Sequence, residues 1–134
     1  MALKRVLLAE DDPDDRELFC KFIQERKDIE LLATAVDGGM LLQLLDEVKS
    51  EQNLPDMIIL DHNMPKMTGL EVLNILKDRP RYAHIPVLVY STYADHNFTK
   101  KFKEAGAVAV VSKPVTANGY REMIDEFMRA VPSA

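Results

Sequence analysis

The chain is poor in several features that define common protein classes. Its 134 residues include a single cysteine, Cys20, which excludes a disulfide framework and fits a reducing, cytoplasmic setting. Basic residues are not in excess: 17 Lys and Arg stand against 22 Asp and Glu, a formal net charge of −5. Phosphate backbones bind basic surfaces, so nucleic acid is not an expected partner. No apolar run approaches the roughly 18 residues that a membrane span needs.

Histidine is also scarce. The three histidines, His62, His84 and His96, do not have the spacing of a metal-binding motif. We therefore expect each of them to be structural or exposed, and we do not expect a zinc site.

What the chain does contain is a regular alternation of apolar runs and helical patterns. The length predicts one domain, residues 1–134, with a core at about 4–130 and no output domain after it. Asp12 before Pro13 predicts a helix start, and Gly106 predicts a helix end. A turn is expected at Asp37-Gly38-Gly39. The expected strands are 4–9, 29–35, 57–60, 86–91 and 107–111, and each is followed by a helical pattern.

Five strand–helix repeats predict an α/β fold with a parallel sheet and right-handed crossovers. The strands are almost continuously apolar, which is typical of a sheet with helices on both faces. Strand 29–35 offers only Thr34 at its end and is expected at an edge of the sheet.

Polar residues gather where the expected strands end, which is where parallel α/β sheets bind their ligands. Each has a simpler explanation alone: an acid can cap a helix or open a turn, and a lysine can be solvated. Their convergence on one edge favours a functional site. The residues are Glu10, Asp11, Asp61, Ser91, Thr92, Ser112 and Lys113.

Three of these residues are acids that would repel one another. Two unit charges about 4 Å apart cost on the order of 4 kcal/mol at an effective dielectric constant near 20. A domain has only roughly 5–15 kcal/mol of stability. Either one acid is protonated or a divalent cation lies among them, and oxygen ligands suit Mg²⁺ or Mn²⁺.

A cation, a carboxylate, a hydroxyl and a lysine together suit phosphoryl chemistry. The cation and Lys113 would neutralise phosphate oxygens, and a hydroxyl would donate to one of them. A carboxylate can act as the nucleophile and form an aspartyl phosphate. Asp61 is the best candidate, because it ends a central strand and leads into a turn, 63–69, that can direct a backbone carbonyl at the metal.

Four segments carry a resemblance to a known family. "LLAEDDPDD", "IILDHNMPKMTGLEVL", "IPVLVYST" and "VVSKPV" resemble, in order and spacing, the motifs of receiver domains of two-component response regulators. The resemblance covers about residues 4 to 130. It implies a flavodoxin-like (βα)5 fold, with a five-stranded sheet in the order 2-1-3-4-5.

The resemblance also implies roles for the site residues. Asp61 would accept a phosphoryl group, Asp11 would bind Mg²⁺ directly and Glu10 would bind it through water. Asn63 would give the metal its backbone carbonyl. Ser91, with Thr92, and Lys113 would bind the phosphate. A cis Lys113–Pro114 peptide bond is expected, since proline permits it and it would direct the lysine inward.

Other positions bear on signal output and lifetime. The family usually has an aromatic residue where this chain has Val110, so we expect the output to run through Ser91 and the loop and helix after it rather than through an aromatic residue at position 110. Asn63 and Tyr93 occupy the positions that border the path of a hydrolytic water. Asn63 favours hydrolysis, and we expect the bulkier Tyr93 to exclude water and prolong the phosphorylated state.

The resemblance implies partners as well. These are a sensor histidine kinase or a histidine phosphotransfer protein, and an unknown downstream protein. The stretch "DRPRYAHIPVLVYS" is similar to a subgroup of stand-alone receivers, some partnered with phytochrome-type kinases. A homodimer through the face formed by helix four, strand five and helix five is a further hypothesis.

Three alternatives stay open. A haloacid-dehalogenase-type phosphatase would need an acid where this chain has Asn63. A flavodoxin would need a phosphate-welcoming loop where this chain has "EDDPDD". A receiver could also bind partners without being phosphorylated, although the acids, Ser91 and Lys113 argue against that.

Overall fold

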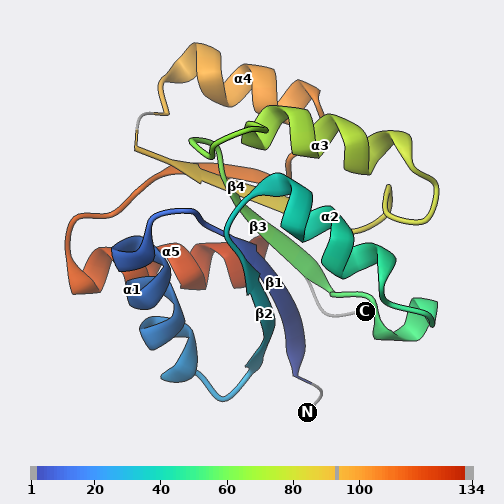
Figure 1. Ribbon diagram of the computed structural model, residues 1–134. Coiled ribbons are helices and arrows are strands. Elements are labelled where there is room, and N and C mark those ends of the chain that lie inside the picture. The colour runs from blue at the N-terminus through green and yellow to red at the C-terminus, as the bar shows by residue number, and fades with distance from the viewer. Residues whose placement is uncertain (1–2, 93, 132–134) are drawn as a thin grey trace.

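The computed structural model describes residues 3–92 and 94–131, which form five consecutive strand–helix units (Figure 1). The strands are β1 (Lys4–Ala9), β2 (Ile29–Ala35), β3 (Met57–Asp61), β4 (Val87–Ser91) and β5 (Ala109–Ser112). The helices are α1 (Pro13–Gln24), α2 (Gly38–Asp46), α3 (Gly69–Asp78), α4 (His96–Glu104) and α5 (Ala117–Ala130), with a short 3-10 turn at Glu51–Asn53. The predicted alternation is confirmed.

The strands form one parallel sheet in the order β2-β1-β3-β4-β5. This is the predicted flavodoxin-like order, and β2 lies at an edge as expected. Every residue of β3 and β4 is buried, which explains why their sequences are almost entirely apolar. Asp61 ends the central strand, and its register partner is Tyr90 on β4.

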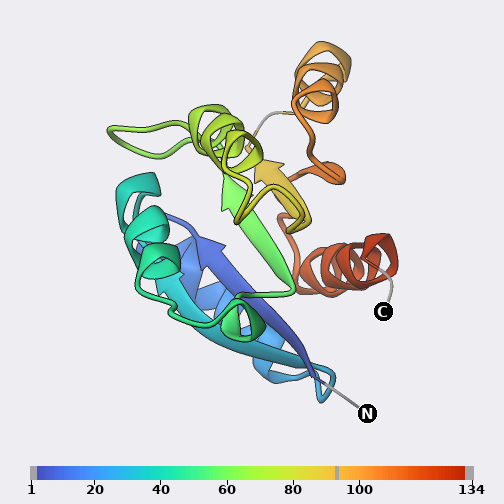
Figure 2. The same cartoon turned by 90° about the vertical axis from the view of Figure 1, so that its right-hand side faces the viewer.

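Helices cover both faces of the sheet. Helices α1 and α5 lie on one face, and α2, α3 and α4 lie on the other (Figures 1 and 2). Each face has its own apolar core. The first includes Phe19 and Phe127, and the second includes Leu41, Leu73 and Phe102. Among the described residues, no helix is long and apolar enough to cross a bilayer.

The start of α1 is confirmed. Asp12 is the N-cap, and its carboxylate accepts backbone hydrogen bonds from Asp14 and Asp15 at 2.9 and 3.1 Å. Pro13 occupies the first helical position, where its missing N–H costs nothing. The result fixes the first turn of α1 beside the end of β1.

The turn expected at Asp37-Gly38-Gly39 is wrong, because α2 already begins at Gly38. Asp37 is its N-cap and accepts a hydrogen bond from the Met40 amide at 2.8 Å. Gly38 is required for packing: a Cβ atom there would lie 2.5 Å from a methyl group of Val72 on α3. The glycine thus brings α2 and α3 close together.

The last strand begins two residues later than predicted, at Ala109. Gly106 follows the end of α4 with φ of +113°, a conformation that glycine adopts readily, which confirms its role at the helix end. The Ala107 amide still bonds to the Phe102 carbonyl at 3.0 Å. Residue 107 therefore belongs to the connection that closes α4.

Candidate functional site

The carboxyl ends of β1, β3, β4 and β5 place the predicted polar residues together. Among the described residues, the buried polar or charged side chains are Glu10, Asp61 and Ser91, each at most 1% exposed. All three lie at this one edge of the sheet. Burying a polar group is costly unless it is paired, so this concentration indicates a site selected for function.

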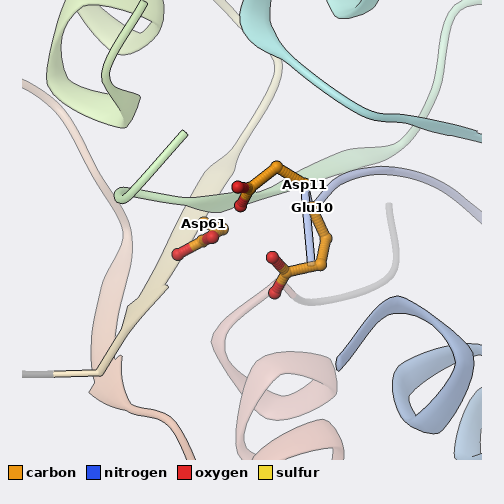
Figure 3. A group of neighbouring side chains, drawn as sticks. All are labelled: Glu10, Asp11 and Asp61. Atoms are coloured by element: carbon orange, nitrogen blue, oxygen red, sulfur yellow. The ribbon is translucent and has the colours of Figure 1, made fainter. Parts of the chain in front are cut away.

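The three predicted acids do converge. Carboxylate oxygens of Glu10, Asp11 and Asp61 lie within 4.8 Å of one another, and Figure 3 shows the side chains gathered in one place. Oδ2 of Asp61 is buried and accepts no hydrogen bond from the described residues. A set of carboxylate oxygens with one left unbonded suits a hard divalent cation such as Mg²⁺ or Mn²⁺. These residues therefore fit the expected metal.

Asp61 itself is poised between its charged and neutral forms. Burial, together with a hydrogen bond and the negative charge of Glu10, raises the pKa of Asp61 to about 8. Lys113 and the Asn63 amide oppose this shift. Without a cation, protonation of Asp61 thus relieves the repulsion that the sequence predicts.

Glu10 is fixed in place by neighbours on other elements. The Tyr90 hydroxyl donates to its Oε1 at 2.6 Å, and the Asp12 amide donates to its Oε2 at 3.1 Å. The Glu10 amide in turn bonds to the Ala35 carbonyl at 2.9 Å. These bonds tie the end of β1 to β2, α1 and β4, so the Glu10 carboxylate has a defined orientation.

The Lys113 ammonium lies among carboxylates, as predicted. Its Nζ is 2.9 Å from Asp15, 3.0 Å from Glu10 and 3.4 Å from Asp61. It also lies 5.1 Å from the centre of the Tyr90 ring, within the range of a cation–π contact. Burial lowers the pKa of Lys113, but the bonds and charges of the acids outweigh burial and raise it overall. The lysine is firmly cationic.

The cis Lys113–Pro114 bond that the sequence suggested is wrong, because the described chain contains no cis peptide bond. The trans form is the lower-energy isomer of an X–Pro bond. The Lys113 amide donates to the Ser91 carbonyl at 2.7 Å, which extends the β4–β5 pairing. The lysine side chain reaches the acids from this trans backbone.

Asn63 and Ser91 lie on the other side of Asp61. The Asn63 amide donates to Oδ1 of Asp61 at 3.2 Å, and its side-chain amide donates to the Ser91 hydroxyl at 3.4 Å. Thr92 follows Ser91 and is exposed. Tyr93, expected to shield the phosphate, lies outside the described residues.

The turn after Asp61 is compact, and Gly69 explains why. A Cβ at Gly69 would lie 2.8 Å from the His62 Cα, and the Gly69 amide donates to the His62 carbonyl at 3.0 Å. Lys66 at φ of +69° completes the loop. Thr68 then caps α3 through a capping box with Glu71. The start of α3 thus packs back against His62, just after the end of β3, and this closed loop holds Asn63 beside Asp61.

The histidines are structural or exposed, as expected. The His62 ring packs edge-on against Phe98 and Phe102 of α4, with ring centres 5.2 and 5.1 Å apart, while His84 and His96 are exposed. Desolvation lowers the pKa of His62, so its neutral form is favoured. The residue after Asp61 therefore links the site to α4.

Sequence reasoning missed two residues of this site. Tyr90 anchors Glu10, and Asp15 binds Lys113. Tyr90 directly precedes Ser91, so its place at a ligand-binding strand end was a usable signal. Asp15 lies in the first turn of the helix that follows the acidic pair, where a carboxylate is close to the same edge. Neither residue was predicted to belong to the site, because a polar residue within a helix or strand usually forms local hydrogen bonds or faces solvent.

The chain is similar to known proteins. The family model of the response regulator receiver domain matches residues 6–125. The polar-differentiation response regulator DivK of Brucella anthropi is 30% identical over 125 residues, which cover 93% of this chain and 96% of DivK.

Solved structures agree. The phosphorylated cyanobacterial phytochrome response regulator RcpA superposes with a TM-score of 0.83 at 27% identity, covering 98% of each chain. The Mn²⁺-bound response regulator Rcp1 gives 0.78 at 28% identity, covering 92% of this chain and 91% of its own. With the family model spanning most of the sequence, the chain belongs to the response regulator receiver domain family of two-component signalling.

Proposed function

We propose that Asp61 accepts a phosphoryl group, with Mg²⁺ bound, from a phosphohistidine of a sensor histidine kinase or a histidine phosphotransfer protein. One observation carries the proposal. Asp61 is a buried carboxylate with one oxygen that accepts no hydrogen bond from the described residues, and it lies beside Lys113 and two further acids. In a receiver domain, such a carboxylate is suited to act as a nucleophile.

The chain's own residues perform distinct parts of the transfer. A carboxylate oxygen of Asp61 attacks phosphorus, the bond to the histidine nitrogen breaks, and the electron pair leaves with the imidazole. Lys113 and the Ser91 hydroxyl neutralise the phosphoryl oxygens. Glu10, Asp11 and Asp61, with the Asn63 carbonyl, would hold the cation, which would supply further positive charge there. Asp61 must be unprotonated to attack, so charge from Lys113 supports reactivity.

The proposed output is a change of binding partner. The domain would catalyse only its own phosphorylation and dephosphorylation, with Asn63 and Tyr93 bordering the path of the hydrolytic water. The phosphorylated form would bind a downstream protein. Similarity to RcpA supports a phytochrome-type kinase as the phosphoryl source, and such a kinase would act in the cytoplasm.

We further propose a homodimer through α4, β5 and α5. Strand β5 is an outer strand of the sheet with half-buried valines, and Val108 beside it is 41% exposed. Apolar surface at a sheet edge favours association. Light scattering with and without the phosphoryl mimic beryllium trifluoride tests this: a dimer that persists after Val108→Lys would contradict the proposed face.

Intact-protein mass spectrometry after treatment with acetyl phosphate and Mg²⁺ tests the phosphoacceptor. We expect the natural sequence to gain the mass of one phosphoryl group and Asp61→Asn to gain none. Asp56→Asn is the matched control, because Asp56 directly precedes the same strand at its opposite end, where its carboxylate pairs with Arg5. A phosphoryl group on the Asp61→Asn protein, or none on the natural sequence, would overturn the assignment.

A further inference from the structure

The Lys113 ammonium is held by an acid that belongs to neither the metal set nor the phosphoacceptor. Its contact with Asp15, at 2.9 Å, is a hydrogen-bonded ion pair, and the ammonium also forms an ion pair with Glu10 at 3.0 Å. Its distance to Asp61 is 3.4 Å, and the facing oxygen of Asp61 accepts no hydrogen bond. In this state the lysine favours Asp15 over Asp61.

The first turn of α1 determines the position of Asp15. It lies in the first turn of α1, and its amide donates to the Asp12 carboxylate at 3.1 Å. A negative charge in this position is favourable at the positive end of the helix dipole. The Asp15 side chain is 30% exposed, while that of Lys113 is 12% exposed. The acid therefore holds the lysine from the solvent side of the site.

We propose that Asp15 is a positioning residue that withholds Lys113 from Asp61 until a phosphoryl group arrives, and so sets how strongly the site favours phosphorylation. The inference rests on the proposed function of Asp61. A phosphoryl group carries about two negative charges, and it draws the ammonium toward Asp61. Moving the ammonium toward Asp61 weakens its contact with Asp15. The free energy of that lost contact offsets part of the attraction and lowers the affinity of the site for the phosphoryl group.

The opposite role is physically distinct. An ammonium has three N–H donors, so Asp15 could orient the lysine while another donor reaches the phosphoryl group. Removing the Asp15 charge would then weaken phosphoryl binding, because the lysine would lose its orientation. The sign of the effect separates withholding from orienting.

The experiment measures the affinity of beryllium trifluoride, a phosphoryl mimic, by calorimetry at saturating Mg²⁺. For Asp15→Asn we expect binding about fivefold tighter, the scale of one partly exposed ion pair. Asp14→Asn is the matched control. Asp14 is exposed, lies in the same turn, and its amide bonds to the same Asp12 oxygen, at 2.9 Å. We expect it to change affinity less than about twofold, since exposed charges are screened.

A second arm uses a Lys113→Ala background. If Asp15 acts through the lysine, Asp15→Asn should change the affinity there no more than Asp14→Asn does. Equal affinities for Asp15→Asn and Asp14→Asn in the natural background, or weaker binding for Asp15→Asn, would overturn the inference. The proposed function fails in a different way, because the natural sequence would then bind no beryllium trifluoride and accept no phosphoryl group.

Discussion

The two flanks of Asp61 are held by different kinds of interaction. On one flank, called the lysine flank, Glu10, Tyr90, Lys113 and Asp15 contact one another at 2.6 to 3.0 Å. On the other, called the serine flank, Asn63 follows β3, Ser91 ends β4 and Thr92 comes after it. The bonds from Asn63 are 3.2 and 3.4 Å long. Charge holds the first flank, and longer hydrogen bonds hold the second.

Burial follows this division only in part. Glu10 is fully buried and the Lys113 side chain is 12% exposed. On the serine flank Asn63 and Thr92 are exposed, whereas Ser91 is buried. Under the proposed function, a phosphoryl group on Asp61 would compete with existing ion pairs on the lysine flank, while it would meet the exposed polar groups of Asn63 and Thr92 on the serine flank. We therefore expect phosphoryl affinity to depend mainly on the lysine flank and the change of shape mainly on the serine flank.

The largest effect should come from removing the carboxylate charge of Asp61, which burial and the negative charge of Glu10 disfavour. The folded state holds a proton on Asp61 up to about pH 8, while the unfolded chain loses it near 3.8, so stability falls as pH rises through this window. Between about pH 5 and 8 we expect the metal-free protein to lose about 2 to 4 kcal/mol that Asp61→Asn retains.

Urea unfolding of both proteins at several pH values, with a chelator present, measures this difference. Parallel curves for the natural sequence and Asp61→Asn would show that Glu10 and Asp61 do not compete for a proton. Mg²⁺ should flatten the curve of the natural sequence, because a bound cation replaces the proton.

The next effect concerns the cation itself. Mg²⁺ at a hundredfold excess over its Kd should raise the free energy of unfolding by about 2.7 kcal/mol. Asp11→Asn should lose most of this gain, because Asp11 supplies one of the clustered oxygens, while Asp14→Asn should keep it. Thermal unfolding with and without Mg²⁺ provides the measurement. A gain equally present in Asp11→Asn would place the cation elsewhere.

Much of this arrangement could be predicted from the sequence. Asp61, Glu10, Asp11 and Lys113 stand at strand ends, and strand ends meet at one edge of a parallel sheet. The sheet order was predictable only through the resemblance, because apolar runs alone do not specify neighbours. The order of the strands is what brings Lys113 of the last unit to Glu10 of the first.

The features that the sequence did not predict depend on the direction of individual side chains and on local backbone conformation. In the sequence, Tyr90 resembles the other apolar residues of a buried strand, and only the structure shows that its hydroxyl donates a hydrogen bond to Glu10. In the sequence, Gly38 indicates a turn, and only the structure shows that the nearby Val72 side chain leaves no room for a Cβ atom there. The sequence also does not determine the isomer of the Lys113–Pro114 bond, since proline permits both forms.

A smaller effect should separate the flanks directly. Tyr90→Phe keeps the ring but removes the donor to Glu10, so we expect a loss of about 1 to 2 kcal/mol of stability. Mg²⁺ affinity should fall about tenfold, as is typical when a partner of a metal ligand is removed. Ser91→Ala, on the serine flank, should change Mg²⁺ affinity less than about twofold, since a neutral hydroxyl adds little charge. Calorimetry measures both affinities. Equal losses of Mg²⁺ affinity in Tyr90→Phe and Ser91→Ala would contradict the proposed difference between the flanks.

The smallest effect is a change of shape without a large change of free energy. With Mg²⁺ and beryllium trifluoride bound, backbone amide NMR shifts should change in α4 and at Ser91 more than in α1 after its first turn. Ser91 can move toward the phosphoryl group, and the His62 ring, packed edge-on against Phe98 and Phe102, couples the loop after Asp61 to α4. Val110 is too short to act as an aromatic lever. Ser91→Ala should retain ligand binding yet reduce the shifts of α4, whereas α1 shifts as large as those of α4 would show that the lysine flank moves as well.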